Sequence, residues 1–248
     1  MTNKYRRARK KRKKWWPYLL SFFLLVVLGS GIGAYLAFWK AKKTAVTTPS
    51  SSKKKKEKSD LPAVSTKDWQ LILVNRDNVK PELNPQLTDV DAIKVDSRIV
   101  EPTRQFLEAA RKIAPEETLI SGYRSVAEQT ELYNERVAQL EASGLSHEEA
   151  EKQVQTQVQV PGASEHQTGL AIDMSVEAGQ SDELGMQLAA IAPQYGFVLR
   201  YPDGKSNITG VNFENWHFRY VGVENAQYMA KHQLVLEEYI QLLKKAGK

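Results

Sequence analysis

The chain has 248 residues and a formal net charge of +6, with 35 basic and 29 acidic residues. Residues 1–58 hold seventeen of the basic residues but only one acidic residue, so residues 59–248, with 18 basic and 28 acidic residues, are acidic. An acidic main part argues against a nucleic acid partner, and the absence of cysteine excludes a disulfide or a lipid-anchored cysteine.

The first 39 residues resemble a membrane anchor. Nine of residues 1–14 are Lys or Arg, and residues 15–39 contain no charged residue and carry aromatic side chains at both ends. About 20 apolar residues cross a bilayer, and basic flanks stay on the cytoplasmic side. We therefore expect a basic cytoplasmic tail at 1–14 and an uncleaved transmembrane signal-anchor helix at 15–39, with the rest of the chain extracellular at the cell membrane. The alternatives are a buried core helix and a cleavable signal peptide, whose apolar core of about 7–15 residues is shorter than this stretch.

Residues 40–66 are rich in Lys, Ser, Thr and Pro and contain few apolar residues. Such a segment cannot bury enough apolar surface to fold, so we expect a disordered linker. Its run of four lysines, residues 53–56, resembles a nucleic-acid patch, but we expect a solvated stretch near anionic polymer or lipid headgroups. Residues 67–248 then have the length of one ordinary domain.

This domain mixes predicted strands and helices without a repeating strand–helix rhythm. Ser125 with Glu128, and Ser146 with Glu149, form capping-box patterns that begin two of the helices. The mixture indicates an α+β class with an antiparallel sheet. Strands are expected at 69–75, 118–121, 169–176, 197–201 and 212–222, and helices at 102–114, 126–142, 147–159 and 182–196.

The segment SEHQTGLAID, residues 164–173, contains two candidate metal ligands, His166 and Asp173. Their spacing does not suit the i, i+4 ligand pair of helix-based zinc peptidases, but a loop carrying His166 and a strand carrying Asp173 can still meet at one ion. His217 is the third candidate, because alternation in the last strand places it opposite the apolar residues. Two imidazoles and one carboxylate hold zinc tetrahedrally and leave one position for water.

Glu214 lies three residues before His217. A metal-activated water needs a nearby carboxylate that takes its proton and returns it to the leaving amine. Taken singly, each of these residues has an ordinary interpretation as a surface, core or turn residue. Their grouping favours a zinc hydrolase, whereas His147 and His232 lack such a context.

Three blocks of the domain resemble the signature blocks of the VanY-type D-alanyl carboxypeptidases, a family that includes the L,D-carboxypeptidases of cell-wall turnover. The blocks are SGYRS (121–125), SEHQTGLAID (164–173) and ENWHFRYVG (214–222), and the resemblance covers Trp69 to the C-terminus. It implies an α+β fold with a small antiparallel sheet flanked by helices, and one zinc ion per chain. The implied zinc ligands are His166, Asp173 and His217, and the implied catalytic acid and base is Glu214.

Further site residues follow from the same resemblance. Arg124 matches the family arginine that polarises the scissile carbonyl or binds the terminal carboxylate of the substrate; a surface salt bridge is its alternative role. Gln129 and Ser164 match positions near the substrate cleft. The alternative is that either residue only caps or braces a loop. Tyr123 is a wall of the cleft or a core residue. Residue 215 is Asn where many relatives have Pro, which bears only on the stiffness of the loop.

The resemblance implies a zinc carboxypeptidase that removes the C-terminal D-alanine from peptidoglycan stem peptides, and D,D- and L,D-specificity stay equally open. A D-Ala-D-Ala dipeptidase fits less well, because its substrate is cytoplasmic. One alternative is a catalytically inactive, zinc-containing module that binds cell-wall peptides, which the presence of Glu214 disfavours. Another is a membrane-tethered structural protein with a closed metal site, for which the sequence offers no fourth ligand.

Overall fold

The structure, a computed structural model, describes residues 60–248, within the compact unit Lys58–Lys248. The predicted cytoplasmic tail, the predicted anchor helix and most of the predicted linker lie outside the described residues. Within residues 60–248, no helix combines the length and apolar character needed to cross a bilayer.

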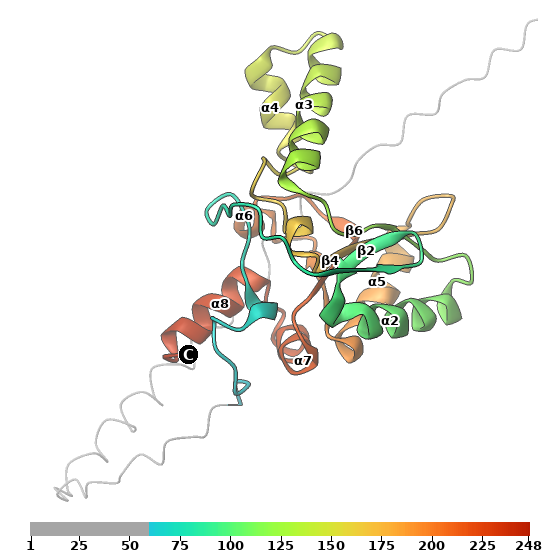
Figure 1. The fold of residues 1–248 in the computed structure, drawn as a ribbon, viewed down its shortest axis with the longest axis vertical. Coiled ribbons are helices and arrows are strands. Elements are labelled where there is room, and N and C mark those ends of the chain that lie inside the picture. The colour runs from blue at the N-terminus through green and yellow to red at the C-terminus, as the bar shows by residue number, and fades with distance from the viewer. Residues whose placement is uncertain (1–59) are drawn as a thin grey trace, which may run out of the picture. The chain divides into compact units, whose positions relative to one another are not determined.

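The described residues form an α+β fold in which a short hairpin and a four-stranded antiparallel sheet are joined by helices (Figure 1). The strands are β1 (Leu87–Val90), β2 (Ile93–Asp96), β3 (Thr118–Ser121), β4 (Ala171–Ser175), β5 (Phe197–Tyr201) and β6 (Glu214–Tyr220). The α-helices are α2 (Val100–Ile113), α3 (Val126–Ala142), α4 (His147–Val154), α5 (Asp182–Ile191), α6 (Ser206–Thr209), α7 (Val223–His232) and α8 (Leu236–Lys245). Four 3-10 helices accompany them: η1 (Trp69–Leu71), η2 (Ser97–Ile99), η3 (Glu165–Thr168) and η4 (Ala192–Tyr195).

The larger sheet has the strand order β3-β4-β6-β5, and every neighbouring pair is antiparallel. Its main core contains Phe106 of α2, Leu188 of α5, and Ile172 and Phe218 of the two central strands, all fully buried. Phe106 packs edge-on against Phe218, with ring centroids 5.1 Å apart. Because side chains alternate along a strand, His217 and Asp173 point away from this core to the other face of the sheet.

Helices α3 and α4 form an arm that projects from the body of the domain (Figure 1). Both helices begin with the predicted capping boxes, in which Ser125 and Ser146 accept hydrogen bonds from the backbone N–H of Glu128 and Glu149. The arm has an apolar cluster of its own. Its buried members are Tyr133, Val137, Ala150 and Val154.

The prediction of a strand at residues 69–75 is wrong. Residues 69–71 form the 3-10 helix η1, and the backbone oxygens of Gln70 and Ile72 accept hydrogen bonds from Arg219 at 3.1 and 2.8 Å. The segment is therefore held by a buried side chain rather than by a neighbouring strand. The sequence also did not predict the β1–β2 hairpin, whose turn places Asp91 at a φ of 50°.

Three helix boundaries differ from those expected. Helix α2 begins at Val100, so Pro102 lies inside its first turn, where a missing backbone N–H has no cost. Helix α4 ends at Val154 rather than at residue 159. Helix α5 ends at Ile191 and continues as η4 up to Gly196, whose φ of 83° ends the helical segment.

Candidate active site

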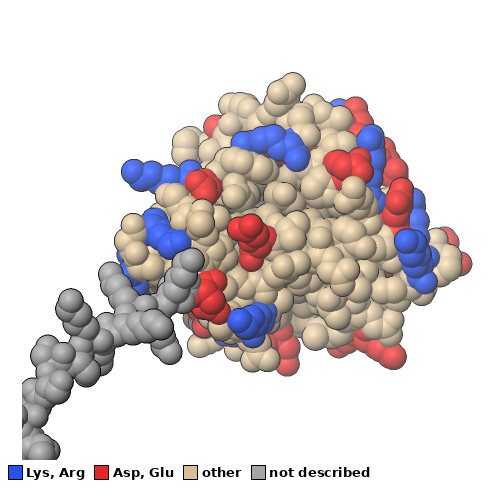
Figure 2. All heavy atoms as spheres, turned by 90° about the horizontal axis from the view of Figure 1, so that it is seen from below, with Lys and Arg blue, Asp and Glu red and all other residues tan. Residues whose placement is uncertain are grey.

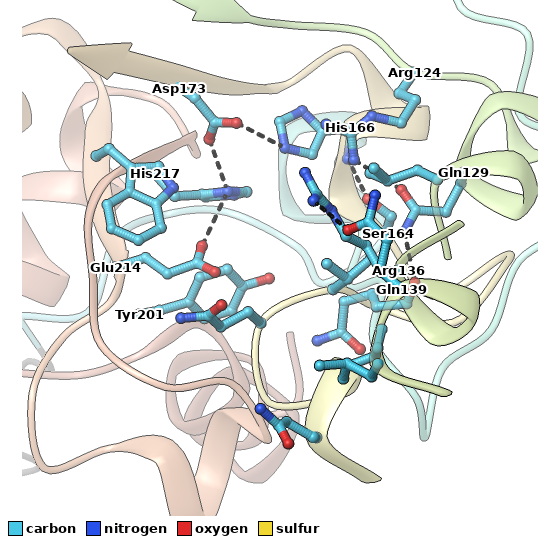
Figure 3. A pocket seen from close by; sticks show the side chains of 18 residues that line it. Arg124, Gln129, Arg136, Gln139, Ser164, His166, Asp173, Tyr201, Glu214 and His217 are labelled. Atoms are coloured by element: carbon cyan, nitrogen blue, oxygen red, sulfur yellow. Dashed lines mark hydrogen bonds and ion pairs between the residues drawn. The ribbon is translucent and has the colours of Figure 1, made fainter. Parts of the chain in front are cut away.

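His166, Asp173 and His217 come together on the face of the sheet opposite the main core (Figure 3). One ligand atom of each residue lies within 4.8 Å of those of the other two, and all three side chains are buried. Asp173 of β4 pairs directly with His217 of β6, while His166 is carried by η3 just before β4. A strand pair and a loop thus converge, as the sequence predicted.

The ring of His166 is oriented by its surroundings. Its Nδ1 lies 2.6 Å from the backbone oxygen of Gly122, so Nδ1–H donates there and Nε2 faces Oδ2 of Asp173 at 3.4 Å. Helix η3 ends at Thr168 and is followed by its cap Gly169, whose φ of 67° favours glycine. A Cβ atom at Gly169 would lie 2.7 Å from the backbone nitrogen of Asp96. Burial lowers the pKa of His166 to about 4, so its ring is neutral near pH 7, the form that binds a metal.

His217 approaches Asp173 from the other side. Its Nδ1 lies 3.1 Å from Oδ1 of Asp173, and this buried oxygen has no hydrogen-bond partner among the described residues. Burial alone would lower the pKa of His217, but the neighbouring carboxylates of Asp173 and Glu165 outweigh burial and raise this pKa to about 10. A metal that binds at Nδ1 therefore displaces a proton. Two imidazole nitrogens and a carboxylate oxygen that lacks a partner form the donor set of a catalytic zinc site.

Glu214 lies beside this triad, with Oε2 3.6 Å from Nδ1 of His217. Strict alternation would send residues 214 and 217 to opposite faces. The pairing of β6 with β5 shifts register between Leu199 and Tyr201, and this irregularity lets Glu214 and His217 share one face. Burial raises the pKa of Glu214 to about 7, so the carboxyl group exchanges a proton readily near neutral pH.

Arg124 approaches from the turn after β3 (Figure 3). Its Nη1 donates to Oε1 of Gln129 at 2.8 Å and its Nη2 to Oγ of Ser121 at 3.2 Å, while its backbone N–H donates to the oxygen of His166 at 3.2 Å. Burial lowers the pKa of Arg124, but Asp173 and Glu214 oppose that shift. An arginine stays ionised in such a place, so the site combines two carboxylates with one fixed guanidinium.

Gln129 and Ser164 line the cleft, as predicted, and both also brace it. The amide of Gln129 accepts from Arg124 and donates to the backbone oxygen of Gln159. The Oγ of Ser164 accepts from the backbone N–H of His166 at 3.4 Å and caps η3. The cleft has a volume of about 530 Å³ and reaches from the triad to the α3–α4 arm.

Two other positions raised by the sequence have different roles. Tyr123 lies outside this cleft; its hydroxyl donates to Glu82 at 3.1 Å in a neighbouring groove. Asn215 ties β6 to the start of α5, because its Nδ2 donates to Oδ1 of Asp182 at 2.7 Å and to the backbone oxygen of Gln180 at 3.2 Å. A proline could not make these bonds.

Arg219 shares the face of β6 that carries His217, but it does not line the cleft. Arg219 is 0% exposed, and its Nη1 donates to Oε1 of Glu165 at 2.9 Å beneath the site. Sequence reasoning also missed Tyr201, which lines the cleft with its ring 4.9 Å from that of His217. Tyr201 ends a strand and pairs with Glu214, so only knowledge of the strand register reveals it.

Comparisons with known proteins place this site in a family. The sequence model of VanY, described as D-alanyl-D-alanine carboxypeptidase, matches residues 92–223. The chain is 38% identical to a D-alanyl-D-alanine carboxypeptidase of Enterococcus faecalis over 178 residues, which cover 70% of this chain and 66% of that protein. It is also 40% identical to the bifunctional D-Ala-D-Ala dipeptidase and carboxypeptidase of Enterococcus gallinarum, over 49% of this chain and 64% of that one. The chain thus spans just under two thirds of the length of these curated relatives.

Solved structures agree with this assignment. A variant of a vancomycin-resistance D,D-pentapeptidase VanY in complex with Zn(II) superposes with a TM-score of 0.65 at 38% identity, covering 70% of this chain and 99% of that one. The LdcB LD-carboxypeptidase superposes with a TM-score of 0.59 at 31% identity, covering 69% and 86%. The zinc complex supports the interpretation of the buried His/Asp/His triad as a zinc site. The chain belongs to the VanY D-alanyl-D-alanine carboxypeptidase family.

Proposed function

We propose that the chain is a zinc-dependent carboxypeptidase that removes the C-terminal D-alanine from peptidoglycan stem peptides. The observation that carries the proposal is the joint placement of the triad, Glu214 and Arg124 in one cleft. The relatives support it, since VanYB has been solved with D-Ala-D-Ala and shares 38% identity with this chain.

His166, Asp173 and His217 hold the zinc ion. When bound, zinc supplies a Lewis acid that lowers the pKa of a water molecule to about 7. Glu214 accepts a proton from the attacking water at its carboxylate. As the peptide C–N bond breaks, it returns that proton to the amine nitrogen of the departing D-alanine, so the carboxylate is regenerated.

Arg124 orients the substrate. Two of its five N–H groups are used by Gln129 and Ser121, which hold the guanidinium in place and leave the others for a ligand. A fixed guanidinium forms paired hydrogen bonds with a carboxylate and stabilises charge that develops on a carbonyl oxygen. Both roles suit a substrate that ends in a free carboxylate next to the scissile bond.

D,D-specificity is the first candidate, and L,D-specificity the second. The VanY relatives at 38% identity favour cleavage after a penultimate D-alanine. The LdcB LD-carboxypeptidase, at 31% identity, favours cleavage after an L-residue. The two activities differ in how the penultimate side chain fits the cleft.

The cellular setting is a separate part of the proposal. A charge-free stretch of 25 residues follows nine basic residues within the first fourteen, and this pattern supports a single-pass anchor with a cytoplasmic N-terminus. The acidic domain then lies on the cell-wall side, where stem peptides occur. On the face seen in Figure 2, acidic and basic side chains are interspersed, without the continuous basic stripe that nucleic acid binding requires.

The deciding experiment incubates residues 58–248, loaded with zinc, with a pentapeptide stem and with a tetrapeptide stem. We expect mass spectrometry to show the loss of one alanine from the pentapeptide; loss from the tetrapeptide instead would assign L,D-specificity. The matched control is Glu214→Gln, which keeps the size of the side chain but cannot act as the base. If the parent shortens neither peptide but binds both, the domain is a binding module rather than an enzyme.

A further inference from the structure

A buried carboxylate outside the triad faces one of its ligands. Glu165 is 1% exposed, and its Oε1 accepts hydrogen bonds from Nε of Arg200 at 2.8 Å and from Nη1 of Arg219 at 2.9 Å. Its other oxygen, Oε2, lies 3.9 Å from Nε2 of His217. Both of these atoms are buried without a hydrogen-bond partner among the described residues.

The two nitrogens of the His217 ring have different surroundings. Nδ1 faces Oδ1 of Asp173 at 3.1 Å and Oε2 of Glu214 at 3.6 Å, so it is the nitrogen on the metal side. Nε2 faces Glu165 on the opposite side of the ring. A metal bound at Nδ1 requires that the single proton of the neutral ring sits on Nε2.

We propose that Glu165 is a positioning residue that fixes His217 in the tautomer with its proton on Nε2, and so aims the lone pair of Nδ1 at the zinc ion. The inference rests on the zinc site of the proposed function. An acceptor-only carboxylate opposite Nε2 favours a proton there, and such partners behind a metal-binding histidine set its orientation. Asp173, the nearest carboxylate to Nδ1, is itself a ligand of the ion, so the ion takes the place of a proton between these two groups.

The arginines explain why Glu165 can act in this way. Because both guanidinium groups bind Oε1, the carboxylate cannot rotate freely, and Oε2 is the oxygen left for His217. Arg200 is held in turn by Glu237 of α8, through two hydrogen bonds of 2.9 and 2.6 Å. The carboxylate is thus fixed by strands β5 and β6 and by the C-terminal helix.

A purely structural role for this buried ion network is the competing explanation, and Glu237 offers a matched control. Glu165 and Glu237 both pair with Arg200, and both are buried, but only Glu165 faces His217. In Glu165→Gln, the side-chain amide oxygen still accepts hydrogen bonds from the two arginines, so the amide NH₂ faces Nε2 of His217. This favours a lone pair on Nε2 and a proton on Nδ1, the tautomer that cannot bind the metal. Glu237→Gln removes the same charge from the same network without that effect.

The test is a comparison of zinc affinity, measured by competition with a chromogenic chelator, for the full chain and both variants. We expect Glu165→Gln to weaken zinc binding about 10- to 100-fold, the usual effect of losing such a partner. Glu237→Gln should stay within about twofold of the parent. Since no substrate is present, the result does not depend on whether the protein hydrolyses stem peptides.

A second variant covers the case in which Glu165→Gln fails to fold. Glu165→Asp keeps the negative charge for both arginines but withdraws the carboxylate from Nε2 of His217, and we expect it to weaken zinc binding more than Glu237→Asp does. Three results would overturn the proposal: unchanged zinc affinity in Glu165→Gln, an equal loss in Glu237→Gln, or equal zinc affinity in Glu165→Asp and Glu237→Asp.

Discussion

Asp173 on β4 and His217 on β6 lie directly opposite each other in the antiparallel sheet, with Oδ1 of Asp173 3.1 Å from Nδ1 of His217. Two of the three ligands are therefore fixed by strand register, and a slip of one residue would send one of them to the other face. Only His166 comes from outside the strands, and the backbone oxygen of Gly122 holds its ring.

Removal of the Asp173 carboxylate, which both His166 and His217 face, should abolish zinc binding. We expect Asp173→Ala to contain less than about a tenth of the zinc of the parent, because two neutral imidazoles alone bind zinc weakly. Elemental analysis after dialysis measures this content. Asp89→Ala is the control, since Asp89 pairs only with exposed Lys94 on the surface. Full zinc occupancy in Asp173→Ala would remove this residue from the ligand set.

The pH dependence of hydrolysis should follow the ionisation of Glu214. Burial raises its pKa to about 7, and only the ionised carboxylate accepts a proton from water. A bound cation favours the ionised form and moves the midpoint below 7. The ratio kcat/KM should thus rise with pH and fall about tenfold per unit below the midpoint. A ratio that stays flat between about pH 5 and about pH 8 would contradict this role.

Gln129 should act on catalysis through Arg124. Its Oε1 accepts from Nη1 of Arg124 at 2.8 Å, so Gln129→Ala frees the guanidinium to move. We expect kcat/KM for a pentapeptide to fall about tenfold, the effect of losing one such hydrogen bond, with the zinc content unchanged. Gln105→Ala, on the exposed surface of α2, is the control. An unchanged kcat/KM in Gln129→Ala would show that Arg124 needs no brace.

Close packing of α5 against β6 should limit substitution at Gly185. A Cβ atom there would lie 2.5 Å from the backbone oxygen of Asn215, next to Glu214. Alanine favours a helix by about 1 kcal/mol over glycine, yet overpacking costs about 1–3 kcal/mol. Gly185→Ala should therefore lower the midpoint of urea unfolding, whereas Met186→Ala, at an exposed position of the same helix, should not. A midpoint in Gly185→Ala equal to that of the parent would show that α5 moves at no cost.

The parts of the fold that depend on local signals were predictable from the sequence. Both capping boxes are confirmed, and the alternation around His217 correctly predicted a strand there, although both faces of that strand are buried. The α+β class and the family are confirmed as well. The His/Asp/His group could be predicted because the resemblance to the family supplied the pairing of distant segments.

The remaining features depend on contacts that no local pattern reveals. Arg219 bonds with Glu165 across 54 positions of the chain, and Arg200 with Glu237 across 37. Alternation along β6 accounts for the position of Arg219 opposite the main core, but it does not show that a buried carboxylate, Glu165, lies there. For the same reason residues 69–75 resembled a strand, although a side chain from β6 binds their backbone.

The cleft beside the triad should accommodate more than the terminal dipeptide. It continues along the α3–α4 arm, where Arg136 and Gln139 line it (Figure 3). Nη1 of Arg136 donates to the neutral amide of Gln139 at 2.9 Å, and the described residues offer it no ion pair that would compete with a ligand. A guanidinium in this position suits an anionic group of the stem peptide upstream of the scissile bond.

Arg136→Ala should therefore discriminate between substrates by length. We expect KM for a full pentapeptide stem to rise about fivefold, a size typical of an exposed ion pair, with kcat unchanged. KM for a minimal acyl-D-Ala-D-Ala peptide should stay the same, because that peptide does not reach the arm. Arg104→Ala, on the exposed face of α2, is the matched control. If KM rose equally for the long and the short substrate, the loss would arise at the triad itself. The upstream part of the stem would then not bind to the arm.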